Sequence, residues 1–164
     1  MATKTLDQVL KGIEKDYGKG IAKIGADALE VEGVLSLGSP MVDYCLYGGL
    51  PEGRIIEYSG AEGSGKTSSS FLVAASYCKE ELKRHPVGKE WEFRGEVHVG
   101  PRKIIFLDNE GTLDPLWAKV FGYDLSEDAD VQTIVIRPEA QSAEEIFDMA
   151  LDLLKTGEVG LLIF

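Results

Sequence analysis

The residues with the clearest chemical meaning lie at positions 60–67, where the sequence reads GAEGSGKT. This stretch fits the pattern G-x-x-x-x-G-K-[ST] at every fixed position. Gly60, Gly63 and Gly65 allow backbone torsions, and a close approach to an anion, that a Cβ atom would prevent. The amide groups of such a loop converge on a phosphate, and the N-terminus of the next helix adds its dipole. The sequence therefore predicts a phosphate-binding loop.

Two side chains at the end of this loop have the chemistry that a nucleotide and its metal ion require. Lys66 is expected to neutralise the β- and γ-phosphates of ATP, and the Thr67 hydroxyl is expected to coordinate Mg²⁺. The other loop positions assigned to nucleotide binding are Ala61, Glu62, Ser64 and Ser68. The alternative is a glycine-rich turn that ends in Lys-Thr by coincidence.

The segments on either side of the loop have the character that a phosphate-binding loop needs. Residues 54–58 form a short β-rich stretch, and residues 68–78 can continue as a helix. Strand, glycine loop and helix in this order are the setting in which the motif has its meaning. We therefore expect the loop to join a strand to a helix.

A second group of polar residues follows a continuous apolar run at residues 103–107. Such a run is typical of a strand that is buried on both faces of a sheet. Asp108, Asn109 and Glu110 come directly after it. Because ligands bind at the carboxyl ends of strands in open α/β sheets, we expect these polar groups to face a ligand.

The remaining patterns predict an α/β fold with a mostly parallel sheet covered by helices on both faces. Further strands are expected at residues 131–136 and 159–164, and a small hairpin is expected at residues 90–99. Further helices are expected to begin after four predicted capping residues, Thr5, Ser39, Asp114 and Ser142.

Length and composition are those of one globular domain. The 164 residues are 44% hydrophobic, which is enough for a core, and no apolar run approaches the length of a membrane span. Cys45 and Cys78 fall in expected helices without metal-ligand spacing, which favours buried free thiols. His85 and His98 are isolated and are expected to be surface or loop residues.

The charge of the chain is strongly negative and unevenly distributed. The net charge is −11, and residues 104–164 hold 13 acidic residues against 3 basic ones. Nucleic acids bind basic surfaces. If DNA is a partner, its main contacts are therefore expected outside the C-terminal third of this sequence.

Taken together, these motifs resemble the RecA family of DNA-strand-exchange ATPases, in a divergent form such as phages carry. The resemblance covers nearly the whole chain. It rests on the loop and on four further stretches, residues 13–20, 35–39, 48–55 and 106–115. Many nucleotide hydrolases share the loop alone, whereas these motifs in this order are much more specific. The resemblance implies an N-terminal helix and linker at residues 1–34 and part of a RecA-like P-loop ATPase core at residues 35–164.

The resemblance also implies roles for three residues beyond the loop. Glu110 matches the general base that activates the water attacking the γ-phosphate, and a carboxylate at the end of a strand is well placed to do so. Asp114 and Trp117 match positions that contact adenine. The alternative for Glu110 is a solvated loop acid, and for Trp117 an aromatic side chain packed into the core.

The sequence departs from the family pattern in two places. The connection at residues 79–102 is longer than expected and is interpreted as a surface insertion. The sequence ends at Phe164, where the family continues with the Walker-B aspartate that supports Mg²⁺ and with its DNA-binding loops. We therefore expect the P-loop ATPase core to be C-terminally incomplete.

These features predict an ATP-dependent DNA recombination and repair protein. The complete protein is expected to bind ATP and Mg²⁺ in the cytoplasm, or in the host cytoplasm if a phage encodes it, and to form a filament of identical subunits on single-stranded DNA. The N-terminal helix is expected to pack on its own domain or on a neighbouring subunit. The alternatives are a truncated nucleotide-binding module without turnover and another RecA-fold ATPase, such as a helicase or a RadA-like factor.

Overall fold

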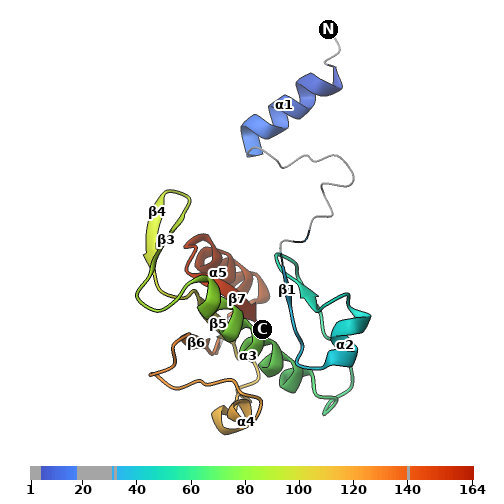
Figure 1. Ribbon diagram of the computed structural model, residues 1–164. Coiled ribbons are helices and arrows are strands. Elements are labelled where there is room, and N and C mark those ends of the chain that lie inside the picture. The colour runs from blue at the N-terminus through green and yellow to red at the C-terminus, as the bar shows by residue number, and fades with distance from the viewer. Residues whose placement is uncertain (1–4, 18–30, 32, 140) are drawn as a thin grey trace. The chain divides into compact units, whose positions relative to one another are not determined.

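The structure is a computed structural model that describes residues 5–17, 31, 33–139 and 141–164 (Figure 1). The chain divides into two compact units, Met1–Gly33 and Val34–Phe164. In the first unit, helix α1 (Leu6–Tyr17) begins with the predicted capping box. The Thr5 amide donates to the Gln8 side chain at 3.1 Å, and the Gln8 amide donates to Thr5 Oγ1 at 3.4 Å. The predicted end of this helix at residue 18 lies outside the described residues.

The second unit is built on a parallel three-stranded sheet (Figure 1). Strand β5 (Lys103–Leu107) lies in the centre and pairs with β6 (Thr133–Ile136) on one side and β7 (Val159–Ile163) on the other. All three strands were expected from their apolar runs. The carboxyl ends of β5 and β6 therefore lie side by side at one edge of the sheet, where Leu107 is level with Ile136.

Helices cover both faces of this sheet, as the alternation of elements predicted. Ile104 and Phe106 point to the face where α3 (Lys66–Arg84) packs, in the larger core cluster. Ile105 and Leu107 point to the opposite face and pack with Ala150 of α5 (Ala143–Lys155). This alternation explains why all positions of β5 from Ile104 onward are buried.

Two small antiparallel ribbons and two short helices complete the unit. Strands β1 (Val34–Leu35) and β2 (Leu50–Pro51) pair antiparallel, and helix α2 (Pro40–Cys45) lies between them in the sequence. Strands β3 (Glu90–Phe93) and β4 (Glu96–Val99) form the predicted hairpin. Its turn has positive φ at Arg94 and Gly95, as a tight two-residue hairpin turn requires. Helix α4 (Pro115–Val120) follows the sheet strand β5.

In the second unit, two of the three predicted helix caps form as expected, and one does not. The Asp114 side chain accepts hydrogen bonds from the amides of Leu116 and Trp117 at the start of α4. Ser142 and Glu145 form a complete capping box at the start of α5. Ser39 stands at the N-cap of α2, but its side chain makes no capping hydrogen bond.

The prediction of a strand at residues 54–58, before the predicted phosphate-binding loop, is wrong. Residues 54–58 belong to no strand, and the Ile55 side chain is 98% exposed. A β-rich segment becomes a strand only when another backbone pairs with it. Among the described residues no backbone does so, although the helix predicted after the loop forms and extends to Arg84.

The two cysteines differ in exposure, so the prediction of two buried thiols is wrong for Cys45. Cys45 is exposed at the end of α2, whereas burial raises the pKa of the Cys78 thiol in α3 to about 11. Because the thiolate is the reactive form, we expect an alkylating reagent at pH 8 to modify Cys45 at least tenfold faster than Cys78. Peptide mass mapping over time measures both rates, and equal rates would contradict the assignment.

None of the helices in the described part of the chain is long and apolar enough to span a membrane.

Candidate nucleotide-binding site

The loop at residues 60–67 has the backbone shape that its glycines predict. Gly63 and Gly65 have φ values of 71° and 88°, in the left-handed region that favours glycine. Gly65 is also the N-cap of α3, so the loop leads directly into the first turn of a 19-residue helix. A Cβ atom added at Gly60 would lie 2.7 Å from Ser64 Oγ, so the Ser64 hydroxyl would have to move aside.

The side chain of Lys66 folds back over the loop. Its Nζ donates hydrogen bonds to the carbonyl oxygens of Gly60 and Ala61, at 2.9 and 3.0 Å. The ammonium group is thus held over the start of the loop, although Lys66 itself begins α3. A positive side chain close to a helix N-terminus favours the binding of a phosphate group. Thr67, Glu62 and Ala61 are exposed and accessible to a ligand.

Helix α4 places Trp117 at the edge of this loop. The Trp117 indole Nε1 is 3.3 Å from Ser68 Oγ in the first turn of α3, and half of the side chain is exposed. Trp117 also packs edge-on against Phe121, with ring centroids 5.2 Å apart, and Phe121 packs against Phe71 of α3. Trp117 is therefore anchored on one side and open on the other, which is the arrangement a stacking platform needs.

Asp114 serves first as the cap of α4. Its Oδ1 accepts both capping hydrogen bonds, at 2.8 and 3.2 Å, and the residue is exposed. Asp114 therefore positions Trp117 through the helix, and the second carboxylate oxygen stays accessible to a ligand.

Glu110 stands in a tight turn at the carboxyl end of β5. The turn is closed by a hydrogen bond from the Gly111 amide to the Asp108 carbonyl at 3.4 Å, and Glu110 is exposed within it. Among the described residues, no hydrogen bond joins the Glu110 side chain to another group. The structure thus brings Trp117 into contact with the loop helix, but it records no contact between Glu110 and the loop.

Asp108 is one of the three polar residues that the sequence predicts at this edge, but it is buried instead of facing a ligand. It is 5% exposed, and its carboxylate accepts hydrogen bonds from the amides of Thr112 and Leu113 and from Arg137 Nε. The only sequence signal was its place in the polar group after an apolar strand. Arg137 gave no signal, because its role depends on β6 lying beside β5.

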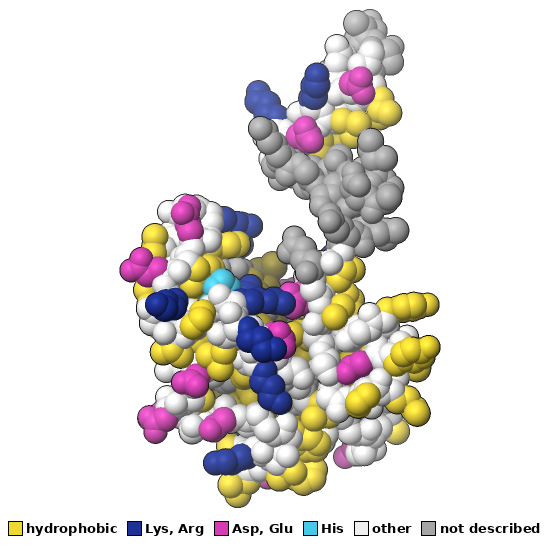
Figure 2. Space-filling view, in the orientation of Figure 1, with side chains coloured by type: hydrophobic (Ala, Val, Ile, Leu, Met, Phe, Trp, Pro, Cys, Tyr) yellow, Lys and Arg dark blue, Asp and Glu magenta, His cyan; other side chains and the backbone are white. Residues whose placement is uncertain are grey.

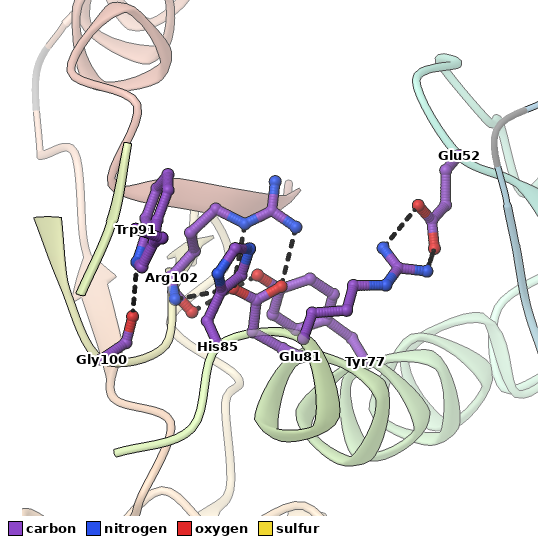
Figure 3. Close-up of polar contacts among 8 residues, drawn as sticks. Glu52, Tyr77, Glu81, His85, Trp91, Gly100 and Arg102 are labelled. Carbon is purple, nitrogen blue, oxygen red and sulfur yellow. Dashed lines mark hydrogen bonds and ion pairs between the residues drawn. The ribbon is translucent and has the colours of Figure 1, made fainter. Parts of the chain in front are cut away.

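A second polar network, also missed from the sequence, lies at the other end of α3 (Figure 3). Glu81 is 1% exposed, and its carboxylate accepts three hydrogen bonds from Arg102, at 2.7 to 2.9 Å. Burial alone would raise the pKa of the Glu81 carboxyl, but the Arg102 hydrogen bonds outweigh burial and hold that pKa below its usual value. Arg84 of the same helix pairs with Glu52 in a bidentate contact. This network fixes α3 to the segments before β5 and after β2.

The hairpin of the long connection packs onto this end of α3 through contacts between aromatic rings. Trp91 lies between His85 and His98, with ring centroids 4.4 and 4.6 Å apart, and donates a hydrogen bond to the Gly100 carbonyl. Both histidines therefore pack against Trp91. His85 lies in the loop after α3, as expected, whereas His98 belongs to strand β4. Burial lowers the pKa of the His85 imidazole, an effect that the negative charge of Glu81 opposes.

Comparison with known protein families gives a consistent result. Residues 4–85 match the model of the RecA N-terminal domain. The chain is 32% identical over 162 residues to Protein RecA of Phytoplasma mali (strain AT), which covers 98% of this chain and 40% of that protein. It is 33% identical over 162 residues to Protein RecA of Streptococcus pyogenes serotype M5 (strain Manfredo), covering 98% of this chain and 36% of that protein.

The chain thus spans about two fifths of the length of the curated relatives that it matches. The family match covers half of the chain and includes the whole loop at residues 60–67. On these grounds the chain belongs to the RecA family.

Proposed function

We propose that the chain is the nucleotide-binding part of a RecA-type DNA recombination and repair ATPase. The observation that carries the proposal is the loop geometry. A left-handed Gly65 leads into the N-terminus of α3, and the Lys66 ammonium is held across the loop by two carbonyl groups. These features bring backbone amide donors, the dipole of helix α3 and the positive charge of Lys66 to one place, which favours binding of a polyphosphate.

The loop residues would hold the phosphates of ATP. The backbone of residues 60–65 and the first turn of α3, including Ser68, supplies the amides, and Lys66 supplies positive charge for the β- and γ-phosphates. The exposed Thr67 hydroxyl would coordinate Mg²⁺, which neutralises phosphate charge when bound. Asp114 and Trp117 would contact adenine, and stacking on an aromatic ring contributes about 1–3 kcal/mol in nucleic-acid sites.

Glu110 would act as the general base for hydrolysis. A general base accepts a proton from the attacking water, so that water must be able to reach its carboxylate. The Glu110 carboxylate is accessible, because the residue is exposed at the carboxyl end of β5. Its carboxylate is not engaged by another described residue and is therefore available to orient a water molecule.

The complete protein would bind single-stranded DNA and assemble from identical subunits in the cytoplasm. Because the chain spans 36–40% of its relatives, we assign DNA binding to regions beyond residues 1–164. Assembly is supported by apolar side chains that are exposed in the described part of the chain. Leu6 and Val9 of α1 are exposed, and Figure 2 shows hydrophobic side chains gathered over the α2 region, where Tyr44 and Tyr47 are exposed. Exposed apolar patches of this kind mark contact surfaces.

Replacing Glu110 by glutamine tests the hydrolytic role. We expect Glu110→Gln to lower the rate of phosphate release from Mg²⁺-ATP at least about 100-fold, since glutamine keeps the shape but cannot accept the proton. The affinity for Mg²⁺-ATP should stay within about twofold. Phosphate release, with and without single-stranded DNA, and calorimetric titration measure the two quantities. Unchanged turnover in the variant would remove Glu110 from this role.

A nucleotide-binding module without turnover is the second candidate. The observation that favours it is the share of the relatives' length, 36–40%, that the chain spans. A chain that binds Mg²⁺-ATP tightly but releases no phosphate, with or without DNA, would establish this second function. A chain that binds no nucleotide would contradict both.

A further inference from the structure

The loop that carries Glu110 is tethered by a side chain that lies before it. Asp108 Oδ1 accepts the Thr112 amide at 3.0 Å, and Asp108 Oδ2 accepts the Leu113 amide at 3.2 Å. The Asp108 carbonyl accepts the Gly111 amide as well. Asp108 thus binds the far end of the loop through three amides, and Glu110 lies between the two attachment points.

The charge of this tether is balanced from the neighbouring strand. Arg137 follows β6 directly, and its Nε is 3.1 Å from Asp108 Oδ2. Asp108 is 5% exposed, so its carboxylate has lost most of its hydration and requires a partner of opposite charge. Arg137 is the basic side chain that the structure pairs with it, and the Arg137 side chain is 58% exposed. The pair therefore joins the ends of β5 and β6.

We propose that Asp108 and Arg137 are a positioning pair for Glu110. This inference rests on the proposed function of Glu110. The Glu110 side chain has no bonded partner among the described residues, so its place at the edge of the sheet is set by the backbone of its turn alone. A general base must be held within a fraction of an ångström of its productive position. The Asp108 carboxylate fixes that backbone, and the ion pair with Arg137 holds the carboxylate in its orientation.

Removing Arg137 should loosen the turn without unfolding the protein, because most of the Arg137 side chain lies in solvent. In Arg137→Ala, we expect amide hydrogen exchange at Thr112 and Leu113 to become at least tenfold faster. The backbone order parameter of Glu110 should fall, while the melting temperature matches that of the control. Arg137→Lys should recover part of the protection, because its ammonium group also pairs with a carboxylate.

The matched control is Arg94→Ala, which removes an arginine from the β3–β4 hairpin, where its guanidinium lies over the Phe93 ring. This control should leave exchange at Thr112 and Leu113 unchanged. Unchanged exchange in Arg137→Ala would overturn the proposal. So would an acceleration spread evenly over β5, β6 and α3, because that pattern means global opening rather than release of the turn.

A second measurement connects the pair to hydrolysis. With the chain in excess over ATP, we expect Arg137→Ala to slow cleavage of bound ATP at least fivefold and to leave its Kd within twofold. A weaker Kd with unchanged cleavage would overturn the positioning role. If the unmodified chain does not bind ATP, the proposed nucleotide-binding function is wrong. If it binds ATP but does not cleave it, the proposed hydrolytic function is wrong. The exchange experiment then still decides whether the pair holds the turn.

Discussion

Lys66→Ala is expected to weaken binding of Mg²⁺-ATP by at least about tenfold. A hydrogen bond to a charged group contributes about 1.5–3 kcal/mol, which corresponds to about 10- to 100-fold in Kd. Lys66 is the basic residue of the loop, and its Nζ already lies over the loop carbonyls of Gly60 and Ala61. Alanine removes this charge and leaves those two carbonyls to water, so the fold should be unaffected.

Lys79→Ala is the matched control for this variant. Lys79 is an exposed lysine on the same helix, away from the loop, and its removal changes the net charge by the same amount. Isothermal titration calorimetry gives the Kd of each protein. Trp117 offers a second signal, because its indole contacts Ser68 beside the loop. Equal affinity in Lys66→Ala and Lys79→Ala would show that the loop does not bind the phosphates.

Glu81→Ala is expected to have the largest effect on stability, a loss of about 3 kcal/mol in the free energy of unfolding. Breaking a buried ion pair by removing one partner costs about 3–5 kcal/mol. The lower end applies here, because the Arg102 side chain is 27% exposed and can recover part of its hydration. Urea unfolding monitored by circular dichroism measures the loss. Glu80→Ala, at the adjacent position where the half-exposed Glu80 side chain pairs with Lys83, should show no measurable change.

The Glu81–Arg102 pair determines how the free energy of unfolding changes as the pH falls. The pKa of the Glu81 carboxyl is lower in the folded protein than its usual value, so its contribution is fully present above the unfolded pKa. The contribution is lost as the pH falls through the folded pKa. The unmodified protein should therefore lose more stability than Glu81→Ala between about pH 5 and pH 3. Parallel curves for the two proteins would show that folding does not lower the pKa of the Glu81 carboxyl.

Local signals in the sequence predicted most of the fold. The apolar run of β5, the hairpin around Gly95 and the capping box at Ser142 depend on residues near one another in the chain. The glycine spacing likewise predicted the left-handed φ values of Gly63 and Gly65 in the loop at residues 60–67. Each of these features follows from the backbone preferences of nearby residues and from whether a strand or helix buries one face or two.

The sequence did not reveal the contacts that depend on distant partners. Glu81 belongs to a helix that is rich in charged residues and is buried only because Arg102, 21 residues later, neutralises it. Asp108 and Arg137 meet because β5 and β6 are neighbours in the sheet. Residues 54–58 have β character but lack a paired backbone among the described residues. Periodicity contains no information on any of these pairings.

The unpaired segment at residues 54–58 also bears on how concentrated solutions of this chain behave. Its backbone can pair with another chain, its Ile55 side chain is 98% exposed, and the outer sides of β6 and β7 are unpaired within the described residues. Exposed edges of this kind are sites of aggregation. The net charge of −11 opposes self-association through mutual repulsion, and salt screens that repulsion. Rising ionic strength should therefore drive these molecules together, although it weakens the ion pairs within each of them.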